Sequence, residues 1–290
     1  MKPAPFEYHA PTTAADAVAL LADLGDAAKP IAGGQSLVPM LALRLAVFDH
    51  LVDLGRVDEL RGIDRRDGVV RIGAMTPQAA AQRSSDVAAV PLLERALPLV
   101  GHFQIRNRGT VGGSIAHADP ASELPAVARA LDADLDVLGP RGRRTIAAAD
   151  FFTGTWTTAL ADDELLTAVT FPVWAGRCGF AVEELARRHG DFAVAGAAVA
   201  VEVGGDDRVA RCGIGLFGLG STPERAATAE AAVVGTPVGD VDAVEVGRLA
   251  MSALESVPSD LHGSEDYRRR VGAEMVARAW RAAGEEATRG

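Results

Sequence analysis

The sequence predicts an α+β fold, and the order of its expected elements is the main reason. Short strand-like and helical runs alternate irregularly as far as Pro172. Three long strand-like runs then follow one another between Phe180 and Phe217, and the chain turns helical after Pro223. Strands followed by helices are typical of an α+β domain. At about 100–200 residues per domain, a chain of 290 residues is expected to hold two or three domains.

Composition and charge exclude several classes of protein. Lys and Arg number 29 against 39 Asp and Glu, and a net charge of −10 argues against an extended nucleic-acid surface. No apolar run approaches the roughly 20 residues of a membrane span, and the first residues lack the apolar core of a secretory signal. Two cysteines, Cys178 and Cys212, are too few for a disulfide framework or a four-cysteine metal or iron–sulfur site. Both are expected to be buried and inert, in a protein of the reducing cytoplasm.

Residues 1–57 are predicted to form a small subdomain. Apolar residues at helical spacing over Thr12–Leu24 end at Gly25, which is typical of a helix C-terminus. A strand, a short helix and a second strand are expected to follow at Pro30–Ala32, Leu37–Leu45 and His50–Leu54.

Residues 58–176 are predicted to contain two hairpins, three helices and a closing strand. An Asp-Gly turn at Asp67 and a Gly-Pro-Arg-Gly turn at Gly139 indicate the hairpins. Their strands are expected at Leu60–Asp64, Val69–Ala74, Leu135–Leu138 and Arg144–Ala147. The helices are expected at Thr76–Arg83, Pro91–Leu99 and Ala121–Leu131. The closing strand, Leu165–Phe171, stops at a proline.

Residues 177–290 are predicted to form the last domain, with three strands before its helices. The strands are expected at Phe180–Ala186, Phe192–Val203 and Arg208–Phe217. The helices are expected at Arg225–Val234, Val241–Val257 and Asp266–Gly284.

Two glycine-rich segments are the candidates for ligand binding. Ala32–Leu37, with the sequence AGGQSL, joins a predicted strand to a helix, and glycines there let the backbone approach a ligand closely. Gly109–Pro120 is predicted as a loop of small and hydroxyl residues before a helix. Consecutive backbone N–H groups near a helix start bind anions, so two such segments suit a diphosphate. The alternative for each is an ordinary tight turn. Arg106 and Arg108, beside the second segment, would either offset phosphate charge or lie on the surface.

A third glycine motif is interpreted as structural. Gly213, Gly215 and Gly218 fit the G-x-G-x-x-G pattern of dinucleotide-binding folds, which must open a helix directly. The chain continues instead to Pro223, and no strand–helix–strand unit surrounds the motif. Glycines in a strand that packs closely on a neighbour are the better interpretation.

The other polar residues give weaker signals. The histidines His102, His117 and His189 are scattered without metal-ligand spacing, so no metal site is expected. Arg187–Phe192 is a polar turn between two predicted strands, either on the surface or facing a ligand. The nucleophile and phosphate-binding motifs of hydrolases and P-loop proteins are missing from the sequence.

Taken together, the two glycine segments resemble the medium, FAD-binding subunit of the molybdenum hydroxylases, the family of aerobic carbon monoxide dehydrogenase and xanthine dehydrogenase. The resemblance covers essentially the whole chain. It continues through further stretches at Asp119–Pro125, Phe151–Gly154, Asp163–Leu166 and Arg187–Ala193. It implies a vanillyl-alcohol-oxidase-type flavin fold, in which subdomains 1–57 and 58–176 clamp FAD and domain 177–290 covers the flavin.

The resemblance also assigns the residues that contact FAD. The backbone of the two segments would hold the diphosphate, and the residues assigned to the site are Ala32, Gly33, Gly34, Gln35, Ser36, Leu37, Thr110, Val111, Gly112, Gly113, Ser114 and Ala118. Glu123 takes the place of an acidic residue that binds the adenosine ribose hydroxyls, a task that suits a carboxylate. Leu165 or Leu166 would pack on the isoalloxazine ring. Some family members carry a lysine near the flavin where this chain has Glu183 and Glu184.

The partners and the electron route are implied in the same way. A large molybdopterin-binding subunit and a small subunit with two [2Fe–2S] clusters would complete the complex, as a dimer of heterotrimers. Electrons would pass from the clusters to FAD in this chain and then to an external acceptor. This chain lacks the cysteine-rich insertion of one branch of the family, so it should hold no cluster itself. The cofactor supplies the redox chemistry, and no catalytic side chain is expected here.

Two other functions remain open from the sequence. A standalone FAD-dependent oxidoreductase would need its own substrate residues over the flavin, and only two tyrosines, Tyr8 and Tyr267, exist to serve one. A non-catalytic accessory protein would have no need of its glycines, yet both glycine pairs are intact. Co-purification with molybdenum and iron–sulfur subunits would separate these functions.

Overall fold

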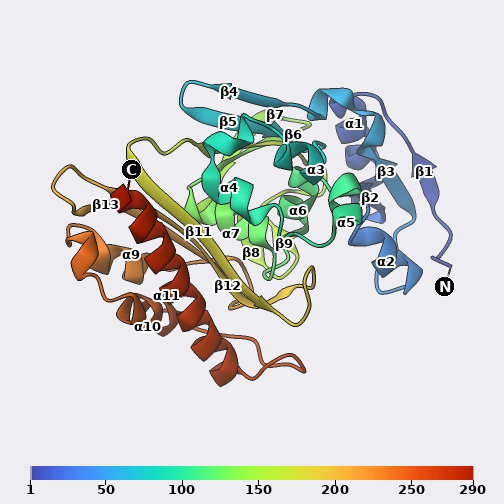
Figure 1. The fold of residues 1–290 in the computed structure, drawn as a ribbon. Helices are drawn as coiled ribbons and strands as arrows, with labels where there is room; N and C mark the ends of the chain where they lie inside the picture. Colours follow the sequence, from blue (N-terminus) through green and yellow to red (C-terminus); the bar gives the residue numbers. More distant parts are fainter. Residues whose placement is uncertain (1, 290) are drawn as a thin grey trace.

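The computed structural model describes residues 2–289 and is built around three main sheets (Figure 1). The first sheet is parallel, in the order β1-β3-β2, with strands β1 (Glu7–His9), β2 (Ala28–Ile31) and β3 (His50–Asp53). Helix α1 (Ala14–Leu24) packs on this sheet, and Thr13 caps it by accepting a hydrogen bond from the Asp16 N–H. Helix α2 (Leu37–Ala42) follows β2 after the turn that contains Gly33 and Gly34.

The second sheet is antiparallel, in the order β4-β5-β10-β6-β7. Its strands are β4 (Ile63–Arg66), β5 (Val69–Gly73), β6 (Asp134–Gly139), β7 (Gly142–Ala147) and β10 (Leu165–Pro172). Both predicted hairpins are therefore confirmed. The helices of this region are α3 (Gln78–Gln82), α4 (Pro91–Ala96), α5 (Phe103–Arg108), α6 (Val111–His117), α7 (Glu123–Ala130) and α8 (Ala148–Phe151). A small ribbon of β8 (Phe152–Gly154) and β9 (Thr157–Thr158) follows α8.

The third sheet is antiparallel and runs in chain order, β11-β12-β13-β14. Its strands are β11 (Arg177–Ala186), β12 (Ala193–Val203), β13 (Val209–Phe217) and the two-residue β14 (Glu224–Arg225). The helices that follow are α9 (Ala227–Val233), α10 (Ala243–Ser252) and α11 (Glu265–Arg289), and α11 lies along β11 and β12 (Figure 1). The expected α+β class, with three long antiparallel strands before the C-terminal helices, is confirmed; β14 is a short addition.

Single 3₁₀ turns join several of these elements. They lie at η1 (Gly25–Ala27), η2 (Leu54–Arg56), η3 (Asp58–Leu60), η4 (Val87–Ala89) and η5 (Val238–Asp240). Within residues 2–289, no helix combines the length and the apolar character that crossing a membrane requires.

The third glycine motif is part of a strand, as interpreted from the sequence. Gly213 and Gly215 lie in β13, and a Cβ atom at either would overlap a backbone carbonyl oxygen of α7, that of Ala130 or that of Ala126. Because only glycine permits this approach, the strand packs directly on the α7 backbone. The motif therefore joins the C-terminal sheet to the region that precedes it.

The C-terminal sheet also shares a hydrophobic core with the second sheet. Phe180, Ala198 and Ala200 belong to the same buried cluster as residues of β5, α4, α7 and β10. The opposite face of the C-terminal sheet forms a second core with α9, α10 and α11. The C-terminal sheet is thus packed on both faces, and its first face joins it to the preceding region.

Two expectations from the sequence are wrong in detail. The segment after Gly109 is not a loop, because α6 begins at Val111 despite its two glycines. The Thr110 hydroxyl caps this helix, which offsets part of the low helix propensity of glycine. Cys178 is only partly buried, whereas Cys212 is buried as expected. Burial raises the pKa of both thiols, that of Cys178 to about 11, so neither is a ready thiolate.

Candidate functional site

The turn after β2 presents a run of unpaired backbone donors. Gly34 has a φ of +71°, a conformation that glycine adopts without strain, and it reverses the chain between β2 and α2. Within residues 2–289, the N–H groups of Gly33, Gly34, Gln35 and Ser36 find no hydrogen-bond acceptor. The Ser36 hydroxyl makes no capping bond to α2. Consecutive free N–H groups beside a glycine turn are the chemistry of an anion-binding site.

The N–H groups at the start of α6 are already paired. Val111 donates to the Thr76 carbonyl oxygen at 3.0 Å, and Gly112 donates to that of Ala74 at 2.9 Å. Gly113 donates to the Thr110 hydroxyl at 3.0 Å. These bonds fix α6 to the segment that follows β5, and they leave this helix start with few donors for a ligand.

The two glycine segments lie directly against each other. A Cβ atom at Gly33 would overlap the Arg108 carbonyl oxygen, and one at Gly113 would lie 3.2 Å from the Ala32 Cβ and 2.7 Å from the Thr110 hydroxyl. A Cβ atom at Gly112 would overlap Ala74. The glycines are therefore needed for this close approach. The structure brings together the two segments that the sequence singles out separately.

A cavity of about 380 Å³ opens beside the first segment. The residues that line it are Ile31, Ala32, Gly33, Gly34, Gln35, Val38, Pro39, Asp53 and Arg108. Arg108, an exposed residue, is the one basic residue among them. Asp53 was not singled out from the sequence; its carboxylate accepts hydrogen bonds from the Tyr8 hydroxyl and from the Gly55 N–H. No local pattern marks Asp53, because it reaches the cavity only through the pairing of β2 with β3.

The structure separates the roles of the two arginines beside the second segment. The Arg106 guanidinium donates to the carbonyl oxygens of Pro98, Val100 and Gly101 and to the Gln82 side chain. It therefore closes the loop between α4 and α5. Arg108 instead lines the cavity. Of the two, Arg108 is the one placed to meet an anion.

Glu123, at the start of α7, is a buried carboxyl group that faces another carboxyl group. Only 6% of its surface is exposed, and burial raises its pKa to about 8, with a contribution from the Glu184 charge. Burial also raises the pKa of Glu184 to about 7, and its Oε2 has no partner within residues 2–289. A buried carboxyl oxygen without a partner is costly, so the Glu184 Oε2, with Glu123 near it, is suited to receive a hydrogen-bond donor from a ligand.

The two adjacent glutamates of β11 face opposite sides of the C-terminal sheet. Side chains alternate along a strand, and Glu184 shares its face with Phe180 and Val182, which pack on the core of the second sheet. Glu183 faces α11 and lies close enough to influence Arg278 there. Glu184 is thus the member of the pair on the side of the glycine segments.

Of the remaining predicted contacts, Leu165, Leu166 and Ala118 are buried and Ser114 is partly buried. Leu165 and Leu166 start β10; Leu165 packs in the core of the first sheet and Leu166 in the core of the second. Ala118 ends α6 in a left-handed conformation with a φ of +52°, and its carbonyl oxygen accepts the Trp156 N–H. Ser114 lies within α6, and its N–H donates to the Thr110 carbonyl oxygen.

An aromatic pair that the sequence did not reveal lies beside Ala118. The His117 and Trp156 rings are nearly parallel, with centroids 6.4 Å apart. The Trp156 indole N–H donates to the Asp119 carboxylate at 3.0 Å, although the Trp156 ring is largely exposed. Burial lowers the pKa of His117. Only the folded hairpin of β8 and β9 places Trp156 here, so no sequence signal could have found it.

The polar turn between β11 and β12 contacts the loop that precedes α5. A Cβ atom at Gly190 would lie 2.8 Å from the His102 imidazole, and the rings of His102 and His189 are 6.0 Å apart. Phe192, at the end of this turn, is largely exposed. The turn therefore connects the C-terminal domain to the loop before α5.

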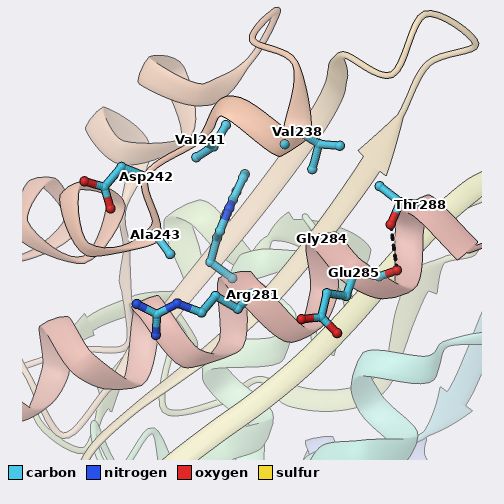
Figure 2. Close-up of a pocket in the computed structure, with 10 residues that line it drawn as sticks. Val238, Val241, Asp242, Ala243, Arg281, Gly284, Glu285 and Thr288 are labelled. Carbon is cyan, nitrogen blue, oxygen red and sulfur yellow. Dashed lines mark hydrogen bonds between the residues drawn. The ribbon is translucent and has the colours of Figure 1, made fainter.

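A second cavity, of about 410 Å³, lies within the C-terminal domain (Figure 2). Its walls come from the turn at Val238–Ala243 and from α11 residues that include Arg281 and Glu285. None of the predicted site residues line it. The two glycine segments, with the smaller cavity beside the first of them, remain the candidate site.

Comparison with known proteins identifies the family. Residues 4–174 match the model of the "FAD binding domain in molybdopterin dehydrogenase", and residues 180–283 match the "CO dehydrogenase flavoprotein C-terminal domain". The chain belongs to this family of FAD-binding medium chains. Like its relatives, it is a FAD-binding component of an oxidoreductase.

Individual medium chains are similar over their full length. The carbon monoxide dehydrogenase medium chain of Hydrogenophaga pseudoflava is 41% identical, with 98% of each chain covered. The 6-hydroxypseudooxynicotine dehydrogenase complex subunit alpha of Paenarthrobacter nicotinovorans is 39% identical, covering 96% of this chain and 94% of that one.

Solved structures agree with the fold. A carbon monoxide dehydrogenase from Hydrogenophaga pseudoflava superimposes with a TM-score of 0.95 at 41% identity, covering 99% of both chains. Quinoline 2-oxidoreductase from Pseudomonas putida 86 gives a TM-score of 0.93 at 36% identity, again covering 99% of both chains. The family resemblance inferred from the glycine segments and the FAD assignment are both confirmed.

The residues of the candidate site fit a flavin dinucleotide. The free donors of Gly33–Ser36 and the charge of Arg108 suit a diphosphate. The glycines at 33, 112 and 113 let the backbone segments pack in contact beside these donors. The unpartnered Glu184 Oε2 and the buried Glu123 carboxyl group near it suit hydroxyl or N–H donors.

Proposed function

We propose that this chain is the FAD-carrying electron-transfer subunit of a multi-subunit molybdenum hydroxylase. Its partners are a large molybdopterin-binding subunit and a small [2Fe–2S] subunit, assembled as a dimer of heterotrimers. Full-length similarity to chains named as medium chains or medium subunits of dehydrogenases and of a hydroxylase supports this proposal. The single observation that carries it is the run of free N–H groups at Gly33–Ser36, placed against the α6 glycines in a chain that matches both family models.

The first segment holds the diphosphate. The N–H groups of Gly33, Gly34, Gln35 and Ser36 donate to its oxygens, and the Ser36 hydroxyl adds a donor that no helix cap uses. Arg108 balances the negative charge from the cavity wall. Ala32 and Leu37 flank this turn and set its position between β2 and α2.

The second segment contributes shape more than hydrogen bonds. Thr110, Val111, Gly112 and Gly113 fix the start of α6 against the segment after β5, and the two glycines let this helix start pack beside the first segment. Ser114 follows them on the same helix. Ala118, at the end of α6, lies beside the cofactor with Trp156 bonded to its carbonyl oxygen.

The buried carboxyl group of Glu123 binds the adenosine ribose. An ionised carboxylate accepts hydrogen bonds from both ribose hydroxyls, which offsets the burial that raises its pKa to about 8 in the unliganded chain. Leu165 or Leu166, at the start of β10, packs on the flavin ring. Glu184 faces the same side and provides a second carboxyl group there.

When bound, FAD would supply the redox chemistry that links the iron–sulfur clusters of the small subunit to an external acceptor. The residues of this chain bind the cofactor, orient it and exclude water. None of them is assigned as a general acid or base.

Two measurements test this function. The chain purified alone and supplied with FAD is expected to show flavin absorbance, and its failure to retain FAD would contradict the cofactor site. Expressed with its genomic neighbours, the chain is expected to co-purify with molybdenum and iron–sulfur subunits. Turnover of an organic substrate by the FAD-loaded chain alone would favour the alternative, a standalone FAD-dependent oxidoreductase.

A further inference from the structure

A cluster of three metal-binding side chains lies at the edge of the first sheet, and nothing in the FAD site uses it. Glu7 and His9 stand two residues apart on β1, so their side chains lie on one face of the strand. His50 begins the neighbouring parallel strand β3 and is the direct partner of Glu7. Two segments 41 residues apart along the chain thus place two imidazoles and a carboxylate together.

The spacing of these groups is that of ligands on one metal ion. His9 Nε2 and His50 Nδ1 are 3.2 Å apart, and His50 Nδ1 and Glu7 Oε2 are 3.6 Å apart. One ligand atom from each residue lies within 4.8 Å of the others. Zinc bound tetrahedrally at about 2.0–2.1 Å places neighbouring ligand atoms roughly 3.3 Å apart. Small rotations of the exposed Glu7 and the partly buried His9 and His50 side chains would bring the three groups to these positions.

We propose that Glu7, His9 and His50 bind one divalent transition-metal ion of the Zn²⁺ class. Two imidazoles and one carboxylate are a donor set that zinc and its neighbours accept, and that magnesium and calcium do not favour. The Glu7 side chain is 76% exposed and that of His50 21% exposed. An ion can therefore enter from solvent, and water completes its coordination.

Such an ion would cross-link β1 to β3. The glycine turn at 32–36 lies in the chain between these strands, and β3 carries His50 at its start and Asp53, which lines the FAD cavity, at its end. A metal at this edge would stabilise the small subdomain that presents the turn. The sequence predicts no metal site. The three residues come together only through the pairing of β1 with β3, which their spacing in the sequence does not reveal.

The test uses the full-length, FAD-loaded chain without an affinity tag, titrated with Co²⁺ and with Zn²⁺. The variants are His9→Gln, His50→Gln and Glu7→Gln, and the matched control is His262→Gln, an exposed histidine whose ring contacts Arg187. FAD content and circular dichroism establish that each variant is folded. Hydrogen exchange at residues 7–9 provides a second measurement of metal binding.

The wild type and the control are expected to bind one ion per chain, with the d–d absorption of four-coordinate Co²⁺ and slower exchange at residues 7–9. Each histidine variant should lose more than the roughly 10- to 100-fold in affinity that removal of an outer-shell partner costs. Glu7→Gln should weaken binding less. The proposal is overturned if the wild type binds no stoichiometric ion, or if the histidine variants bind as tightly as the control.

Discussion

The two glycine segments, Ala32–Ser36 and Thr110–Ser114, lie against each other, yet their backbone N–H groups have different partners. Those of Gly33 to Ser36 have no acceptor within residues 2–289, whereas those of Val111 to Ser114 are bonded to Ala74, Thr76 and Thr110. The first segment therefore offers donors, and the second offers a rigid helix start against which the first one packs. Glycines can serve either purpose, and only the hydrogen-bond partners distinguish them.

The largest effect is expected where the two segments touch. In Gly33→Ala, the new Cβ would overlap the Arg108 carbonyl oxygen, so one segment must move away from the other. We expect the free energy of unfolding to fall by about 3 kcal/mol or more and FAD to be lost. Urea unfolding and the flavin content of the purified chain measure these effects. Full FAD retention by this variant would show that the segments need not touch.

Gly113→Val tests the second segment alone. Its side chain would meet the Thr110 hydroxyl and Ala32 at the face toward the first segment. We expect FAD retention to be abolished with a nearly unchanged far-UV circular dichroism spectrum. If the variant keeps FAD, the second segment is not at the diphosphate.

The two arginines are expected to separate binding from stability. Arg108→Gln removes a charge at the cavity wall and should weaken FAD binding by about tenfold or more, since a charge-assisted hydrogen bond contributes roughly 1.5–3 kcal/mol. Its control, Arg106→Gln, loses bonds to three carbonyl oxygens and should lower the free energy of unfolding instead. Equal FAD affinities for the two variants, measured by fluorescence titration, would contradict this assignment.

The pH dependence of FAD binding tests Glu123. In the unliganded chain, burial raises its pKa to about 8, so it is largely protonated at pH 6 and must lose a proton to bind the ribose as a carboxylate. FAD affinity should therefore increase as the pH rises from about 6 to 8. Glu123→Gln should flatten that part of the profile. A wild-type profile that is level or falls over this range would count against the ribose assignment.

The same carboxyl group affects the stability of the unliganded chain. Its pKa is higher folded than unfolded, so its contribution to stability is full below about pH 4.5 and is lost as the pH rises through about 8. Glu123→Gln should remove this loss. Urea unfolding curves of the wild type and of Glu123→Gln between pH 5 and 8 measure this loss of stability.

The smallest effects are expected from the two hydroxyl residues that precede the helices. Thr110→Ala removes the cap of α6 and should cost about 1 kcal/mol of stability. Ser36→Ala removes a hydroxyl that caps nothing in the unliganded chain, so stability should change by less than about 0.5 kcal/mol. FAD affinity should fall in the serine variant. Thermal unfolding and FAD titration measure both effects. If Ser36→Ala lost stability and Thr110→Ala lost FAD affinity instead, the two segments would have the opposite roles.

The sequence predicts the parts of this molecule that depend on local patterns. The Asp-Gly hairpin, the long C-terminal strands and the structural role of Gly213 and Gly215 follow from turn chemistry, apolar runs and the missing helix start. The two glycine segments stand out because glycine is costly unless the backbone needs it. These features do not require knowledge of distant neighbours.

The remaining features depend on contacts between distant segments. The N–H groups of Val111 and Gly112 are paired because the residues after β5 pass beside α6. The choice of Arg108 over Arg106, and of Glu184 over Glu183, depends on which face of an element meets the cavity or the core. The cluster of Glu7, His9 and His50 arises only from the pairing of β1 with β3.

Hydrogen–deuterium exchange with and without FAD tests the difference between the two segments most directly. Without FAD, the amides of residues 33–36 should exchange quickly and those of residues 111–114 slowly, because only the second set is bonded within the chain. Saturating FAD should slow exchange at residues 33–36 and leave residues 111–114 nearly unchanged. Exchange at residues 33–36 that FAD does not alter would contradict the assignment of this turn to the diphosphate.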